Sequence, residues 1–244
     1  MRRCVKLVLA YDGAAFQGWQ RQSAGRTVQG VMEDAVRAVT KEAAPVAGSG
    51  RTDAGVHACG QVCSFETDCR LAPETLVRAL NANLPEDVAV RAASDQPSGF
   101  HARFSVRRKT YVYRAYVAPE RDPLRRRALH LRDVPDLAAM REAARFLVGR
   151  HDFRSFATSV PPEKSTIRTL MALRVLQARD ELRFFATADG FLRHMVRALV
   201  GQLLRVGSGK DTPREAARIL ATADRAVGPA AAPGHGLVLW RVDY

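Results

Sequence analysis

The chain has 244 residues, of which 47% are hydrophobic and 26% are charged, and its formal net charge is +13. The hydrophobic and charged fractions are those of an ordinary globular protein. No run of residues approaches the ~18 uncharged apolar residues of a membrane span, so we expect no membrane association.

The excess of basic residues predicts a polyanionic partner. Arg supplies 33 of the 38 basic residues, and a nucleotide bias in the genome would account for Arg in place of Lys. Such a bias does not account for the excess of basic residues over the 25 acidic ones. We therefore predict that the partner is a nucleic acid.

The cysteines are interpreted as reduced and structural, because their spacing fits no pairwise zinc pattern. They are Cys4, Cys59, Cys63 and Cys69. The first residues lack a long apolar segment and a small-residue cleavage site, so we expect no signal peptide. Both observations favour the cytoplasm.

Hydrophobic periodicity and turn residues predict an α+β chain. Strands are expected over residues 5–11, 61–65, 88–92, 110–117, 170–177, 182–188 and 237–242. Helices are expected over residues 28–39, 73–80, 137–148 and 192–206. Thr27 is expected to cap the first helix, and the segment Thr212-Pro213-Arg214-Glu215 has the pattern of a capping box that opens one more.

The order of a strand, an Asp-Gly turn and a helix occurs twice, at residues 5–39 and 182–206. This repetition indicates a duplicated α+β unit whose two copies share one sheet. We place the boundary near residue 105, which predicts an N-terminal subdomain over 1–105 and a C-terminal subdomain over 106–244.

The most informative segment is Gly48-Ser49-Gly50-Arg51-Thr52-Asp53-Ala54-Gly55-Val56-His57-Ala58. Its glycines allow the backbone to approach another group closely, and it carries a guanidinium, a carboxylate and an imidazole. It has neither the Gly-Lys-Ser/Thr ending of a Walker loop nor the spacing of a Rossmann fingerprint. Residue type alone slightly favours a turn in which Asp53 accepts backbone hydrogen bonds, as in an Asx turn.

As a whole string, residues 50–58 resemble the active-site motif of the tRNA pseudouridine synthase A family. The resemblance extends in order over nearly the whole chain. Its other blocks include Tyr11-Asp12-Gly13, Gly18-Trp19-Gln20, Thr27-Val28-Gln29-Gly30, His101-Ala102-Arg103, Lys109-Thr110-Tyr111, Arg193-His194-Met195-Val196-Arg197 and Val242-Asp243-Tyr244. The chain departs from the family pattern at Ala198, Cys59 and Cys63, none of which belongs to the proposed chemistry.

The resemblance implies an enzyme that isomerises uridine to pseudouridine at positions 38, 39 and 40 in the anticodon stem-loop of tRNAs, with no metal or cofactor. It implies the pseudouridine synthase fold, in which two similar α/β subdomains share a mostly antiparallel sheet flanked by helices, with the active-site cleft between them. It also implies a homodimer in which one tRNA contacts both subunits.

Four residues match the catalytic positions of the family. Asp53 is the implied nucleophile, and the sequence leaves open whether it attacks C1′ of the sugar or C6 of the base. Tyr111 can stack on the extracted uracil and assist proton removal, and Arg197 pairs with the catalytic carboxylate. Arg51 either fills the space of the displaced base or contacts a phosphate. His57 is interpreted as a structural hydrogen-bonding residue.

A basic cluster before Tyr111 is predicted to clamp phosphates next to the site, and Tyr111 and Arg51 are also predicted to bind the substrate. Its members are Arg103, Arg107, Arg108 and Lys109. The run 125–127 either contacts RNA or forms a solvated loop. The alternative function is a non-catalytic tRNA-binding or chaperone protein on the same scaffold. The acidic Asp53 argues against it, because a carboxylate repels phosphate.

Overall fold

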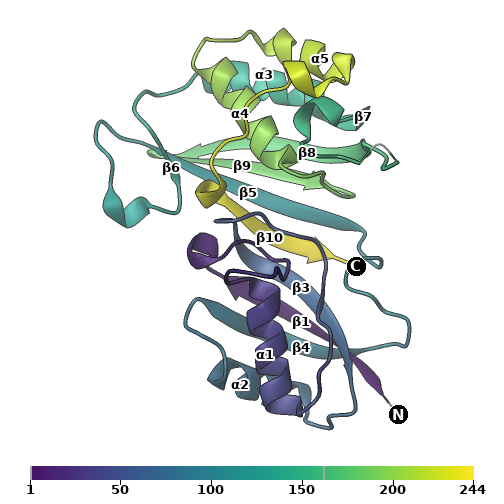
Figure 1. Ribbon diagram of the computed structural model, residues 1–244. Helices are drawn as coiled ribbons and strands as arrows, with labels where there is room; N and C mark the ends of the chain where they lie inside the picture. Colours follow the sequence, from purple (N-terminus) through teal and green to yellow (C-terminus); the bar gives the residue numbers. More distant parts are fainter. Residues whose placement is uncertain (1, 162) are drawn as a thin grey trace. The chain divides into compact units, whose positions relative to one another are not determined.

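A computed structural model describes residues 2–161 and 163–244. Over these residues the chain forms ten β-strands and five α-helices (Figure 1). The strand pairs β1–β3, β1–β4, β2–β3, β5–β9, β7–β8 and β8–β9 are antiparallel, and the pair β5–β6 is parallel. The predicted α+β class with mostly antiparallel strands is confirmed.

The chain divides into two compact units, Met1–Arg107 with Leu239–Tyr244 and Arg108–Val238. The main segment of the first unit ends at Arg107, two residues beyond the boundary that we placed near residue 105. The predicted C-terminal subdomain included the last six residues, whereas the structure assigns them to the first unit. All but the last of these residues belong to the closing strand, which follows β3 in the strand order.

In the first unit the strands follow the order β4-β1-β3-β10. These strands are β1 (Arg3–Tyr11), β3 (His57–Thr67), β4 (Val88–Gln96) and β10 (Leu237–Asp243), with the short β2 (Ala47–Gly48) beside β3. The helices α1 (Val28–Thr40) and α2 (Pro73–Ala82) lie along these strands (Figure 1). Met32, Leu76 and Leu80 are fully buried, so the helices bury their apolar faces.

In the second unit the strands follow the order β5-β9-β8-β7. They are β5 (Arg108–Val117), β7 (Gly149–Asp152), β8 (Ile167–Ala178) and β9 (Glu181–Ala188), with β6 (Leu129–Leu131) beside β5. The helices α3 (Leu137–Leu147), α4 (Met195–Gly207) and α5 (Pro213–Thr222) gather on one side of these strands (Figure 1). Helix α4 has nine buried residues and packs against α3, α5 and β5.

The two predicted helix caps have different outcomes. Oγ1 of Thr27 accepts a hydrogen bond from the backbone nitrogen of Gly30 at 3.3 Å, which confirms this N-cap. The prediction of a capping box at α5 is wrong, because the side chain of Thr212 makes no capping hydrogen bond. Glu215 instead accepts two hydrogen bonds from Arg218, at 2.8 and 2.5 Å, and this charge-assisted pair occupies its carboxylate.

None of the helices in the described part of the chain combines the length and the apolar character that crossing a bilayer requires.

Candidate active site

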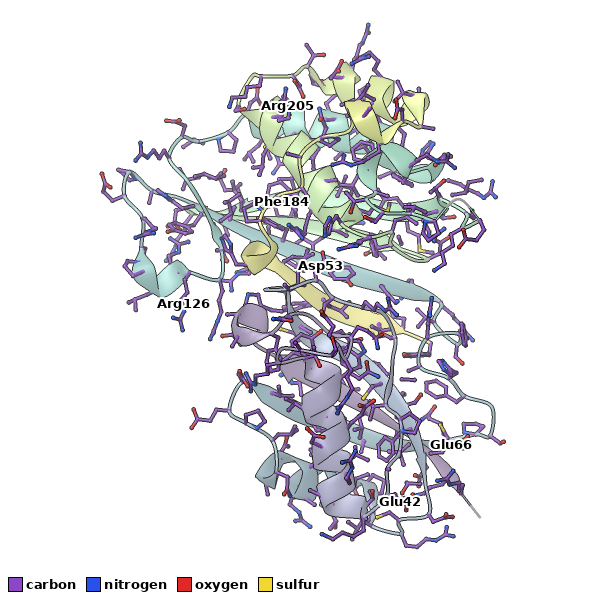
Figure 2. The ribbon with its side chains drawn as sticks, viewed as in Figure 1. Glu42, Asp53, Glu66, Arg126, Phe184 and Arg205 are labelled. Atoms are coloured by element: carbon purple, nitrogen blue, oxygen red, sulfur yellow. The ribbon has the colours of Figure 1, made fainter. Side chains whose placement is uncertain are left out.

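The segment that carries Asp53 is a loop between β2 and β3, with Asp53 partly buried (Figure 2). The backbone of residues 16–19 holds the loop in place. The nitrogen of Trp19 donates to the carbonyl of Thr52 at 3.0 Å, and the nitrogen of Gly55 donates to the carbonyl of Phe16 at 3.3 Å. A turn in which Val56 donates to the carbonyl of Asp53 at 3.2 Å closes the loop.

A buried polar layer supports the loop. Oγ1 of Thr52 lies 2.9 Å from the hydroxyl of Tyr11, and the amide of Gln61 donates to the carbonyl of Gly50 at 2.9 Å. Ser49 donates in turn to Oε1 of Gln61 at 2.7 Å. Burial raises the pKa of Tyr11 to about 12, so its hydroxyl keeps its proton at neutral pH and remains available to Thr52.

Close backbone approach also constrains the loop at Gly18, whose φ of +98° lies in the left-handed region. A methyl group at this position would lie 2.5 Å from the carbonyl oxygen of Thr52. The segment before α1 can therefore pair with the loop only with glycine here.

His57 is the first residue of β3 and is buried. Its Nδ1 lies 3.0 Å from the backbone nitrogen of Gly13, which donates to it, and 2.9 Å from a carboxylate oxygen of Asp12. One ring nitrogen cannot accept from Gly13 and donate to Asp12 at the same time. Either bond joins β3 to the turn after β1, which is the structural role that the sequence indicated for His57.

Arg51 is exposed, and its Nε donates to Oε1 of Gln20 at 3.0 Å. The structure thus brings Arg51 and Asp53 together on one loop. Because the bond to Gln20 uses Nε, it does not occupy the two terminal nitrogens of the guanidinium.

The other two predicted catalytic residues belong to the second unit, on the neighbouring elements β5 and α4. Tyr111 is 7% exposed and meets the ring of Phe191 edge-on, with ring centroids 5.2 Å apart. Nε of Arg197 donates to the carbonyl of Ala232 at 2.7 Å. Tyr113 is fully buried and donates to the carbonyl of Pro233 at 2.9 Å, as expected for a core aromatic residue.

The predicted phosphate clamp consists mainly of exposed side chains. Arg103, Arg107 and Arg108 are exposed, and Lys109 is partly buried at the start of β5. The guanidinium of Arg103 lies 5.5 Å from the centroid of the Phe104 ring. The backbone nitrogen of Arg107 donates to the carbonyl of Asp243 at 2.9 Å, which fixes the chain just before β5.

The arginines of the run 125–127 differ from one another. Arg125 forms an ion pair with Asp180, and its guanidinium lies 4.2 Å from the centroid of the Tyr116 ring. Arg126 and Arg127 are exposed on the segment between β5 and β6, and Figure 2 labels Arg126 there. Arg125 therefore holds this segment to its own unit, whereas the side chains of Arg126 and Arg127 are exposed.

Sequence reasoning assigned no role to Gln20, Gln61 or Tyr11, although all three belong to the support of the loop. The available signal was Gln61, an amide next to the apolar strand residues Val62 and Cys63. A buried amide must find hydrogen-bond partners, and here it finds them in the loop.

A family model described as tRNA pseudouridine synthase matches residues 7–105 and 143–244. The chain is 44% identical to the tRNA pseudouridine synthase A of Anoxybacillus flavithermus, over 100% of this chain and 99% of the relative. The chain belongs to the tRNA pseudouridine synthase family.

Two further relatives with the same description come from Geobacillus kaustophilus and Bacillus subtilis, at 43% and 42% identity. They cover 100% and 98% of this chain, and 95% and 98% of their own lengths. The family membership predicted from the motif is confirmed. The family model includes the Asp53 loop and α4, whereas Tyr111 lies in the unmatched part, 106–142, which the relatives cover.

The close approach at Gly18 gives a testable prediction. Gly18→Ala should destabilise the protein by at least about 1 kcal/mol more than Gly209→Ala. Gly209 also has a positive φ, +72°, but a methyl group there would meet no described atom within 4 Å beyond its own neighbours. Both variants carry a left-handed strain of about 1–2 kcal/mol, and only Gly18→Ala adds a collision. Urea unfolding measures the difference, and equal losses of stability would contradict this description of the loop.

Proposed function

We propose that this protein is an enzyme that isomerises uridine to pseudouridine at positions 38, 39 and 40 in the anticodon stem-loop of tRNAs. The observation that carries the proposal is the loop with Asp53, set within a chain that matches tRNA pseudouridine synthases A over its full length. The net charge of +13 suits an RNA substrate.

In this proposal the carboxylate of Asp53 is the nucleophile, and it forms a covalent bond to the substrate at C1′ or at C6. The bond between N1 and C1′ then breaks, the uracil turns, and C5 forms the new bond to the sugar. By the last step the bond to Asp53 breaks and its electron pair returns to the carboxylate, the proton on C5 leaves, and N1 gains a proton. Substrate and product are isomers, so the atoms balance without an oxidant, a reductant or a co-reactant. The target base must leave its stack to reach Asp53.

The remaining site residues have supporting roles in the proposal. Tyr111 stacks on the uracil, and its hydroxyl assists the removal of the proton. Arg197 holds the Asp53 carboxylate ionised and oriented, since a guanidinium stabilises the charged form of a nearby carboxylate. Its anchor on Ala232 uses Nε, so the terminal nitrogens are the ones that would face the carboxylate.

We further propose that the enzyme is a cytoplasmic homodimer in which one tRNA contacts both subunits. Two copies double the basic surface, and distant phosphate contacts position an RNA without reading its sequence. Cys4, Cys59, Cys63 and Cys69 are free thiols, which suits a reducing compartment.

The central prediction concerns the nucleophile. Asp53→Asn should abolish pseudouridine formation while the near-UV circular dichroism and tRNA affinity stay unchanged, because the amide keeps the shape but not the reactivity. Asp95→Asn is the matched control, since Asp95 is a half-exposed carboxylate that pairs with Arg3. Mass spectrometry of digested tRNA measures the product. If Asp53→Asn retains turnover within about tenfold of the parent, the carboxylate has no chemical role and the nucleophile assignment fails. An inactive parent that binds tRNA would favour the chaperone alternative.

The second prediction separates the two roles of Tyr111. If the hydroxyl transfers the proton, Tyr111→Phe should slow the single-turnover rate by about 10²-fold or more, because general acid–base catalysis contributes that much. Tyr113→Phe is the control, and it should cost about 1 kcal/mol of stability with the rate unchanged. A normal rate for Tyr111→Phe together with a slow Tyr111→Ala would reduce Tyr111 to a stacking surface.

The third prediction concerns RNA binding. Replacing Arg126 and Arg127 together with Gln should weaken binding of full-length tRNA and reduce the slope of log K against log salt by about 0.7–0.9 for each phosphate that the two arginines neutralise. The control replaces the exposed Arg214 and Arg218 of α5, which removes the same charge. Filter binding at several salt concentrations measures both. Equal slopes for the two double variants would show that only net charge matters.

The dimer has a test of its own. After subunit exchange, Asp53→Ala protein mixed with protein that lacks Arg126 and Arg127 should regain activity on full-length tRNA, because one subunit supplies the arginines and the other the nucleophile. A monomer in sedimentation at assay concentrations would contradict the proposed dimer and leave the role of Asp53 untouched.

A further inference from the structure

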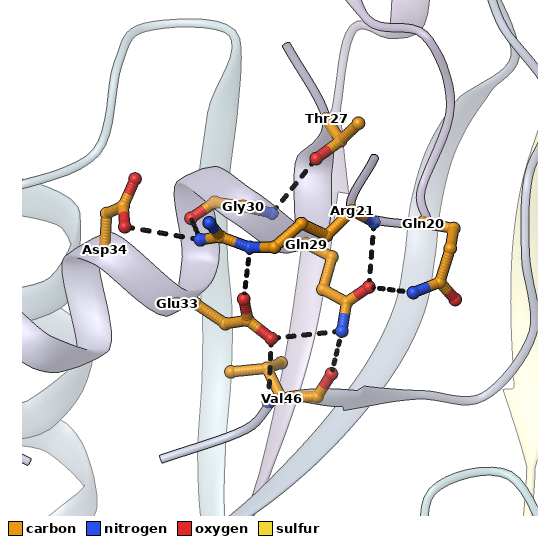
Figure 3. A network of polar contacts seen from close by, with 8 residues as sticks. All are labelled: Gln20, Arg21, Thr27, Gln29, Gly30, Glu33, Asp34 and Val46. Carbon is orange, nitrogen blue, oxygen red and sulfur yellow. Dashed lines mark hydrogen bonds and ion pairs between the residues drawn. The ribbon is translucent and has the colours of Figure 1, made fainter. Parts of the chain in front are cut away.

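The side chain that holds Arg51 is itself held by a second glutamine. Gln20 accepts from Nε of Arg51 at 3.0 Å through its Oε1, and its Nε2 donates to Oε1 of Gln29 at 2.7 Å. Figure 3 shows the amides of Gln20 and Gln29 pointing toward each other, one from the segment before α1 and the other from the first turn of α1.

The amide of Gln29 is saturated and can take only one orientation. Its Oε1 also accepts from the backbone nitrogen of Arg21 at 2.9 Å, and its Nε2 donates to the carbonyl of Val46 at 3.1 Å and to Glu33 at 3.0 Å. A backbone nitrogen can only donate and a carbonyl can only accept. Exchanging the oxygen and the nitrogen of Gln29 would break both of these bonds, so the backbone fixes the amide.

The orientation of the Gln29 amide determines the orientation of the Gln20 amide. Because Oε1 of Gln29 is an acceptor, Gln20 must present its Nε2 to Gln29 and its Oε1 to the other side. The group on that other side is Arg51, which can only donate. The backbone groups of Arg21 and Val46 thus determine that an acceptor faces Arg51.

Glu33 strengthens the same arrangement from α1. Its Oε1 accepts from the backbone nitrogen of Val46 at 3.3 Å as well as from Gln29, and its Oε2 accepts from Nε of Arg21 at 2.6 Å (Figure 3). Arg21 also donates to the carbonyl of Gly30 at 3.2 Å. Val46 directly precedes β2, which leads into the Asp53 loop. Three segments of the chain therefore converge on the support of one arginine.

We propose that Gln20 is a positioning residue for Arg51, and that Gln29 sets the direction in which Gln20 acts. Arg51 is exposed and its side chain has many rotamers, so holding Nε restricts the guanidinium before RNA arrives. The terminal nitrogens then point in a reproducible direction from the loop that carries Asp53. The kinetic test of this inference rests on the proposed function. The NMR test of it depends only on the hydrogen bonds that hold Arg51.

The kinetic test is a double-mutant cycle on the full chain. Gln20→Leu should lower the single-turnover rate or the tRNA affinity by about tenfold, and in the Arg51→Ala background it should change either by less than about twofold. A decrease in rate assigns Arg51 to the reacting nucleotide, and a decrease in affinity assigns it to a phosphate. Gln29→Glu, which replaces the two donated hydrogens with an acceptor, should reproduce the decrease. Gln22→Leu is the control, since Gln22 is exposed and bonds to the carbonyl of Gln17.

Additive effects of Gln20→Leu and Arg51→Ala would overturn the inference. A Gln20→Leu enzyme with unchanged rate and tRNA affinity would overturn it as well.

A second measurement does not depend on enzymatic activity. The Nε–H signal of Arg51 in ¹⁵N NMR spectra, assigned by its absence in Arg51→Lys, should report a restricted side chain in the parent and in Gln22→Leu, and a mobile one in Gln20→Leu. Equal mobility in the parent and Gln20→Leu would overturn the inference even for an active enzyme. A parent that forms no pseudouridine but shows the restricted signal would overturn the proposed function alone.

Discussion

The loop that carries Asp53 keeps its shape because the backbone of residues 13–19 lies directly against it. A methyl group on Gly13 would lie 2.0 Å from the carbonyl oxygen of Val56, and one on Gly18 would lie 2.5 Å from that of Thr52. The loop thus carries hydrogen bonds from a neighbouring backbone on one side and rests on the buried hydroxyls and amide of Tyr11, Thr52 and Gln61 on the other. A nucleophile on such a loop is held before the substrate binds, which lowers the entropic cost of reaction.

The two arginines that we propose for catalysis share one kind of contact. Nε of Arg51 meets the amide oxygen of Gln20, and Nε of Arg197 meets the carbonyl oxygen of Ala232. An uncharged acceptor at Nε orients the planar guanidinium without neutralising it. Arg125 shows the contrast, because its charge is engaged by Asp180 and by the Tyr116 ring. Arg125 therefore stabilises its own unit, whereas an uncharged acceptor orients Arg51.

The sequence predicted the strands and helices with strong periodicity and the motif around Asp53, because both signals are local. It placed the start of β3 at residue 61, whereas the strand begins at His57. The segment contains Gly60, a weak strand former, and a methyl group there would lie 2.4 Å from the carbonyl oxygen of Trp240. The glycine is required because β10 passes close by, and that contact joins residues far apart in the chain.

Local sequence signals were also insufficient to identify the residues of the proposed site. Asp53, Tyr111 and Arg197 were identified only through the resemblance to a family, since residue types alone allowed Asp53 to be a turn residue. The role of Gln20 depends on the direction of an amide that backbone groups of Arg21 and Val46 fix through Gln29. No periodicity or spacing encodes such a direction. It follows from which groups can donate and which can accept.

The most direct test of the proposed activity is to incubate the purified full chain with unmodified tRNA in EDTA, with no added cofactor, and to map pseudouridine nucleotide by nucleotide. We predict pseudouridine within the anticodon stem-loop at positions 38, 39 and 40, and none when Asp53 is replaced by Asn. A tRNA that is bound but remains unmodified, or activity that chelation removes and one specific metal restores, would contradict the proposed activity.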